Sequence, residues 1–295
     1  MTDNTSPSAL PLDGVTVVDL SRLVSGNMLT HVLADLGATV IKIEPPRKGD
    51  ELRGWQRDGV STYWAAYSRN KESVELDLRS EEGKKDLHGL IEKADMLVEN
   101  FRPGKLERMG LTRDFLQTLN PRLIAVRISG WGQTGLFANK GGFGSLIEAI
   151  SGFAAMNGFA DRPPVLPPFA MADNVAGLYG AVVALALLHE QRSAHEPRVR
   201  EVDLSLFEPL FSVLGPQAAE FKLTGKVVPR SGSRSPTHAP RNVYQTRDER
   251  WVALSAGMEG TLARLLMALA TQKHFQIRAS PRMRHGYKTS MRWRR

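Results

Sequence analysis

The sequence predicts an α/β fold, a Rossmann-like doubly wound parallel sheet, with a second, smaller domain that is incomplete in this chain. Short apolar stretches typical of buried strands alternate with helical stretches from Val15 to Ser129. This alternation is the pattern of a sheet that carries helices on both faces. A strand, a helix and a second strand already fit between Val15 and Ile43, and so short a unit predicts parallel strands joined by a helix.

The large domain is expected over residues 11–224. Pro45 and Pro46 end its second strand, and Ser80 is placed to cap the helix that follows the third strand. We expect strands at Val15–Leu20, Thr39–Ile43, Ser73–Leu78, Met96–Glu99, Leu123–Ser129 and Arg200–Asp203, and helices at Asn27–Asp35, Glu81–Lys93, Arg113–Leu119, Ser145–Met156, Val175–Leu188 and Leu204–Thr224, with a proline-rich connector at Asp161–Pro168.

The start of the small domain is expected over residues 225–270, and a basic tail over 271–295. The small domain would open with a flexible loop at Gly225–Thr237, rich in Gly, Pro and Ser. A pair of short strands at Asn242–Gln245 and Trp251–Ser255 and a helix at Gly260–Leu269 would follow.

The amino-acid composition excludes several kinds of functional site. The chain has 295 residues, no cysteine and a net charge of +8, so disulfides, thiolate metal sites and a cysteine nucleophile are excluded. Lys273–Arg295 holds eight Lys/Arg and no Asp/Glu, and the rest of the chain has as many acidic as basic residues. The excess charge is therefore local, and nucleic-acid binding is a minor alternative. Met1–Pro11 shows no secretory pattern, so we expect a cytoplasmic protein without a membrane partner.

Several common functional motifs are incomplete or absent in this sequence. Gly130–Gly135 fits the dinucleotide pattern G-x-G-x-x-G, but a loop-like stretch follows it where that fingerprint needs a helix. The sequence shows neither a serine nucleophile elbow nor a Walker loop. No spacing of His, Asp and Glu suggests a metal site.

Asp173 is the most informative single residue. It stands two residues before the uncharged run Val175–Leu188, which is too short to span a bilayer and is expected to be a core helix. One interpretation is a plain N-cap, the usual role of Asp before a helix. The other is a reactive carboxylate that the helix N-terminus keeps ionised. The local sequence favours the cap and leaves both open.

Four short segments carry basic or amide groups next to predicted strand ends or turns. They are Leu76–Arg79, Asn100–Gly104, Arg108–Gly110 and the loop around Lys140. Ligands of open α/β sheets bind beyond the carboxyl ends of the strands. Arg, Lys and backbone N–H groups at that edge suit a phosphorylated, nucleotide-like ligand.

These segments together resemble the class III CoA-transferase family, also called the CaiB/BaiF family. The resemblance runs from about Pro11 to about Leu265 in constant order. It is carried by Leu12–Leu20, Leu36–Glu44, Gly49–Asp50, Asn70–Asp77, Glu99–Gly110, Ser129–Gly135, Met171–Asp173 with Gly177, Ser235–Pro240 and Trp251–Ser255.

The resemblance implies a function and its residues. Asp173 would be the nucleophile that moves CoA from an acyl-CoA to a carboxylic acid, through an aspartyl anhydride and an aspartyl-CoA thioester. Coenzyme A would be a substrate, no cofactor would be bound permanently, and the partner would be a second chain in an interlocked homodimer. The implied CoA contacts are Leu76, Asp77, Leu78, Arg79, Asn100, Phe101, Arg102, Arg108, Met109 and Lys140.

Two departures leave alternatives open. A similar branch racemises 2-methylacyl-CoA with a His-Asp pair, but Phe143-Gly144 stands at that place here, which disfavours a racemase. Transferases often carry an acid where this chain has Gly144. Near Leu265 the sequence leaves the family pattern, which predicts truncation or a frameshift and admits a non-catalytic remnant that only binds CoA.

Overall fold

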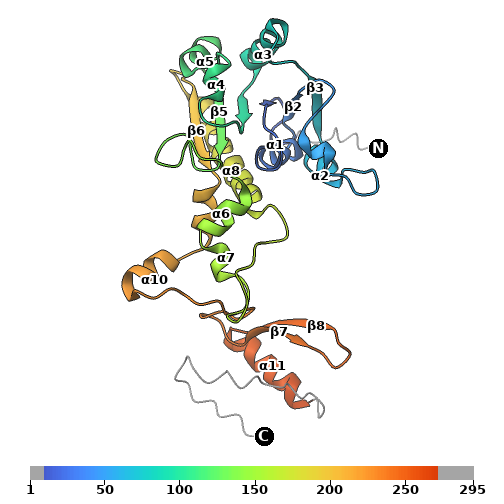
Figure 1. Ribbon diagram of the computed structural model, residues 1–295, viewed down its shortest axis with the longest axis vertical. Coiled ribbons are helices and arrows are strands. Elements are labelled where there is room, and N and C mark those ends of the chain that lie inside the picture. Colours follow the sequence, from blue (N-terminus) through green and yellow to red (C-terminus); the bar gives the residue numbers. More distant parts are fainter. Residues whose placement is uncertain (1–9, 272–295) are drawn as a thin grey trace, which may run out of the picture. The chain divides into compact units, whose positions relative to one another are not determined.

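The computed structural model describes residues 10–271 and divides the chain into two compact units between Arg230 and Ser231. The first unit contains a six-stranded sheet, and the second contains a two-stranded sheet (Figure 1). The predicted basic tail, apart from its first residue, lies outside the described residues. The assignment of residues 225–270 to the start of a small domain stays a prediction.

The large sheet is parallel throughout and has the order β3-β2-β1-β4-β5-β6. The strand order reverses between β1 and β4, which creates the switch point where open α/β sheets bind ligands. The predicted Rossmann-like fold is therefore confirmed. The strands are β1 (Thr16–Asp19), β2 (Thr39–Glu44), β3 (Lys71–Glu75), β4 (Met96–Glu99), β5 (Ile124–Ser129) and β6 (Arg200–Ser205).

One face of the sheet is covered by α1 (Ser25–Asp35) and α8 (Met171–Ser193), which cross closely. A Cβ on Gly177 would come within 2.8 Å of the backbone oxygen of Ser25. Glycine at this crossing allows the two backbones to approach. The first hydrophobic core fills this side of the sheet, with fully buried residues such as Leu29 and Ala176.

The opposite face is covered by α3 (Glu81–Lys93), α4 (Lys105–Arg108) and α5 (Arg113–Leu119). Their apolar residues form a second core that includes Leu87 and Leu116. Ser80 caps α3 as predicted, since its Oγ accepts from the Gly83 N–H at 3.0 Å. The bounds of α3, α5 and β4 agree with the predicted ranges.

Two predicted helices are each broken in two. The helix expected at Ser145–Met156 is interrupted where Gly152 adopts φ +93°, and the one expected at Leu204–Thr224 is interrupted at Gly215, φ +85°, before Pro216. Both glycines take a left-handed conformation that ends a helical turn. The resulting helices are α6 (Gly144–Ile150), α7 (Phe153–Met156), α9 (Phe207–Val213) and α10 (Gln217–Thr224). Three short helices were not predicted from the sequence: η1 (Glu51–Gly54), α2 (Thr62–Tyr67) and α4 (Lys105–Arg108).

The apolar run expected at Val175–Leu188 belongs to the longer helix α8, which begins at Met171. By length and composition α8 is the one helix of residues 10–271 that could cross a membrane. Its small residues pack against α1, and it also contacts β5, β6 and α9. These contacts are those of a core helix.

The second unit contains β7 (Arg241–Gln245) and β8 (Trp251–Ser255), paired antiparallel, and α11 (Glu259–Thr271). The predicted strand pair is present here. A tight turn joins the two strands, in which Thr246 N donates to Arg250 O at 2.8 Å.

Candidate active site

The carboxyl ends of β1 and β4 are joined across the switch point by Asn100. Its Oδ1 accepts from Arg22 N at 2.8 Å, and its Nδ2 donates to Arg22 O at 2.6 Å and to Ser25 Oγ at 3.4 Å. Asn100 was predicted to contact CoA. In the structure its side chain is hydrogen-bonded to the backbone of the loop between β1 and α1. Asn100 therefore fixes the position of this loop at the switch point.

A buried charge network lies under the same loop. Asp19 Oδ1 is 3.3 Å from Lys42 Nζ, and its Oδ2 is 3.4 Å from Lys71 Nζ, with all three side chains at most 1% exposed. Burial works to raise the pKa of Asp19, but the two lysines and hydrogen bonds from Ser21 and Thr30 hold it well below its usual range. The network ties β1, β2 and β3 to the start of α1.

Asp173 is the third residue of α8, not its N-cap. The N-cap is Ala170, which has no side chain to bond the free N–H groups. Instead the Ala172 N–H donates to Glu148 Oε1 of α6 at 3.2 Å. The interpretation of Asp173 as a cap is therefore wrong, because the helix starts two residues before it.

The Asp173 carboxylate lies directly against α6. A Cβ on Gly144 would come within 2.3 Å of Asp173 Oδ2, so only glycine leaves room for the carboxylate in this position. Burial, and then the charge of Glu148, raise the pKa of Asp173 to about 6. The sequence predicts that the helix N-terminus stabilises the ionised form. These two effects outweigh it, although a carboxyl group with this pKa is still mostly ionised at pH 7.

Four of the predicted CoA contacts share one side of the sheet. Phe101, Met109, Leu76 and Leu78 pack against the second core, next to α3, α4 and α5. Asp173 lies on the other side, where α8 and α6 meet the first core. A ligand that touched both groups would therefore cross the switch point beside Asn100.

The charged residues among the predicted CoA contacts lie at separate places in the loops that follow β3, β4 and β5. Arg79 pairs with Asp77 at 2.9 Å after the edge strand β3, and β2 and β1 separate that strand from β4. The Arg108 guanidinium lies 3.1 Å from where a Gly104 Cβ would be. Lys140 Nζ lies 4.4 Å from the centre of the Phe137 ring. Arg102 is exposed on the loop after β4.

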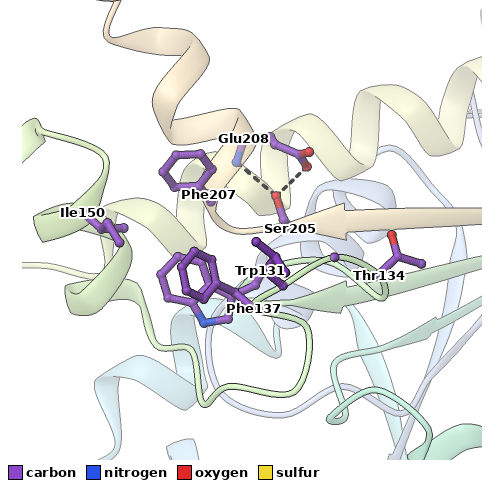
Figure 2. Close-up of a pocket in the computed structure, with 9 residues that line it drawn as sticks. Trp131, Thr134, Phe137, Ile150, Ser205, Phe207 and Glu208 are labelled. Carbon is purple, nitrogen blue, oxygen red and sulfur yellow. Dashed lines mark hydrogen bonds between the residues drawn. The ribbon is translucent and has the colours of Figure 1, made fainter.

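A small cavity of about 210 Å³ lies at the carboxyl ends of β5 and β6 (Figure 2). Trp131, Phe137 and Phe207 form its aromatic wall, and Ser205 Oγ donates to Glu208 Oε2 at 2.6 Å. Ile150, the last residue of α6, also lines the cavity. None of the predicted site residues lines this cavity.

Three residues of the site were missed from the sequence: Glu148, Glu99 and Lys71. Glu99 is 1% exposed, accepts from Phe101 N at 2.6 Å and pairs with Arg127, and burial raises its pKa to about 7. A signal existed for Glu148, because it is the single charge within an otherwise apolar helical stretch. The sequence around Glu148 did not indicate that it would contact Ala172 on another helix.

The fold and the site define a doubly wound α/β protein with a partly buried carboxylate at the start of the core helix α8. A family model described as CoA-transferase family III matches residues 12–290. The chain belongs to this family.

Individual relatives agree with the family match. The chain is 40% identical over 262 residues to succinyl-CoA–D-citramalate CoA-transferase of Chloroflexus aurantiacus, covering 88% of this chain and 65% of that protein. It is 35% identical over 274 residues to the alpha subunit of succinyl-CoA–L-malate CoA-transferase of the same organism, covering 91% and 63%. The chain therefore spans less than two thirds of these relatives.

Solved structures show the same fold. A CaiB/BaiF family protein from Brucella suis superimposes with a TM-score of 0.80 at 33% identity, covering 89% of this chain and 70% of that one. Rv3272 from M. tuberculosis gives a TM-score of 0.72 at 28% identity, covering 88% and 69%.

Proposed function

We propose that this protein is a CoA-transferase that moves CoA from an acyl-CoA to a free carboxylic acid, with Asp173 as the nucleophile. The observation that supports this most is the Asp173 carboxylate, set against Gly144 at the start of a core helix. Its neighbours leave it ionised at neutral pH and limit its motion, as a carboxylate nucleophile requires.

The first half of the reaction transfers CoA to the protein. An Asp173 oxygen attacks the thioester carbonyl, the carbon–sulfur bond breaks, and CoA leaves as a thiolate from a mixed anhydride. The thiolate then attacks the Asp173 carbonyl, forming an aspartyl-CoA thioester and releasing the donor acid as its carboxylate. No net proton is taken up or released in either step.

The second half reverses these steps with the acceptor. Its carboxylate attacks the aspartyl thioester and expels the thiolate, which then attacks the acceptor carbonyl of the new anhydride. Acyl-CoA leaves and the Asp173 carboxylate is restored. Because water would hydrolyse the anhydride, the site must exclude water while both intermediates exist.

Binding would use the edge of the sheet around the switch point. We propose that CoA contacts the loops after β3, β4 and β5, through Leu76–Arg79, Asn100–Arg102, Arg108, Met109 and Lys140. The apolar residues among them lie on one side of the sheet and Asp173 on the other, so the thioester would pass the β1–α1 loop. We further propose a cytoplasmic homodimer.

The test is exchange between succinyl-CoA and isotopically labelled succinate, whose relevance the succinyl-CoA-dependent relatives suggest. Label should enter the thioester with the unaltered protein. Asp173→Ala and Asp173→Asn should reduce the exchange rate by about three orders of magnitude or more, because the covalent route is lost. Asp161→Asn, in the exposed connector, is the matched control and should exchange normally.

Two outcomes would count against the proposal. One is undiminished exchange by Asp173→Asn. The other is no exchange with labelled succinate, glutarate, malate, citramalate or oxalate and their CoA thioesters. Solvent deuterium entering C2 of a 2-methylacyl-CoA would instead support the racemase alternative.

A further inference from the structure

Glu148 contacts the start of α8 from a different helix. It lies on α6, is 3% exposed, and its Oε1 accepts from the Ala172 N–H at 3.2 Å. Because Ala170 offers no cap, Glu148 satisfies a backbone donor that the helix itself leaves free. Ala172 immediately precedes Asp173, so this hydrogen bond acts one residue away from the proposed nucleophile.

The same face of α6 also accommodates the Asp173 carboxylate. Gly144 stands one helical turn before Glu148 and leaves the space that Asp173 Oδ2 occupies. α6 therefore meets the first turn of α8 at two points. Gly144 limits where the carboxylate can lie, and Glu148 fixes the backbone next to it.

We propose that Glu148 is a positioning residue for Asp173, holding the first turn of α8 through the Ala172 N–H while its own negative charge acts on the Asp173 carboxylate. The proposal rests on the function proposed above. Glu148 does not itself touch the reacting atoms. It acts on Asp173 in two ways that substitutions can separate: through its hydrogen bond with the Ala172 N–H and through its charge.

Among the described residues, Glu148 is the charged group whose electrostatic effect changes the pKa of Asp173. α1 presents the backbone oxygen of Ser25 and the side chain of Met28 at Gly177. α2 presents the Tyr67 hydroxyl, which donates to Asn174 Oδ1 at 2.9 Å. After burial, the charge of Glu148 is the next cause that raises the pKa of Asp173.

Substitutions can separate the two effects of Glu148. Glu148→Gln keeps an oxygen that accepts from Ala172 N but removes the charge. Glu148→Ala removes both. Glu92→Gln changes an exposed glutamate on α3, on the other face of the sheet, and is the matched control.

The first measurement is the pH profile of kcat and KM for exchange of labelled succinate with succinyl-CoA. Glu148→Gln should shift the acid limb of kcat down by about half a pH unit or more, with KM unchanged, because a like charge is removed. Glu148→Ala should lower kcat a further tenfold or so at every pH, because the nucleophile loses its fixed position. An unshifted limb in Glu148→Gln, or equal kcat in the two variants, overturns the proposal.

A second measurement does not need activity. Asp173→Asn is introduced into the unaltered protein and into Glu148→Gln, and the midpoint of thermal unfolding is recorded at pH 7 and pH 4. The gain from Asp173→Asn at pH 7 should be smaller in the Glu148→Gln background, where no charge opposes Asp173. An equal or larger gain in the Glu148→Gln background overturns the inference even if exchange is observed, whereas a smaller gain supports it even if exchange is absent and the proposed function fails.

Discussion

At the scale of single residues, Asp173 combines features that work against stability. Its carboxylate is partly buried, lies against Gly144 of α6, and has a pKa that burial and the charge of Glu148 raise to about 6. A carboxyl group with a folded pKa above its ordinary value of 3.8 favours the unfolded state once it is ionised. If Asp173 is the nucleophile proposed above, its ionised form is therefore held at a cost in folding free energy.

We expect Asp173→Asn to raise the stability of the protein at pH 7. Stability should fall as the pH rises from about 4 to 6 in the unaltered protein, because the unfolded chain releases this proton first. Asparagine removes that dependence and should add about 1–2 kcal/mol at pH 7, allowing for partial exposure. Denaturant unfolding at pH 7 and pH 4 measures the difference, and a variant less stable at pH 7 than at pH 4 by the same amount as the unaltered protein would contradict it.

A second residue-scale prediction concerns Asp19. Asp19→Ala leaves the buried Lys42 and Lys71 without their shared carboxylate. The expected loss is about 3–5 kcal/mol, typical of breaking a buried ion pair on one side. Asp161→Ala, in the exposed connector, is the control in the same urea titrations. A loss below 1 kcal/mol or so would mean that the network is hydrated and weak.

At the scale of elements, the crossing of α1 and α8 places Asp173 relative to the switch point. Gly177 lies one turn after Asp173 and touches the backbone of α1 at Ser25. A shift of α8 at this crossing would therefore move the proposed nucleophile relative to the loop held by Asn100. The glycine matters for its missing side chain, since it lies inside a helix where glycine is otherwise unfavourable.

Gly177→Ala should separate the two helices. The added Cβ would come within 2.8 Å of Ser25 O and of Met28 Cβ, so the crossing must widen, at a cost of about 1–3 kcal/mol. Gly89→Ala is the matched control, since Gly89 lies inside α3 with open space around it and should gain about 0.5–1 kcal/mol from helix propensity. Chemical denaturation compares the two, and equal effects of the same sign would contradict the close crossing.

The sequence predicted elements better than the contacts between them. The sheet followed from local alternation of strands and helices, and Ser80 identified the start of α3 because capping is local. The breaks at Gly152 and Gly215 were missed, since a glycine within an apolar pattern signals a left-handed turn only weakly. The role of Glu148 depends on a helix that lies 24 residues further along the chain, and no local pattern records such a contact.

At the scale of the whole molecule, α8 is only partly covered within its unit. Leu178 is 46% exposed, Tyr179 40% and Val182 67%. These residues recur at helical spacing on one face, and α9 adds Phe211 and Val213, both of which are large and exposed. A contiguous apolar surface on a helix that otherwise fills the core is typical of an interface.

The proposed homodimer gives this face an occupant, a second copy of the chain. Val182→Asp should shift the mass measured by light scattering from dimer towards monomer, because an isologous contact would bury the new carboxylate twice in an apolar surface. Val60→Asp, at an exposed turn, should leave the mass unchanged. A monomeric unaltered protein would contradict the homodimer itself. A Val182→Asp variant that stays dimeric at low micromolar concentration would show instead that the two chains associate through a surface other than this face of α8.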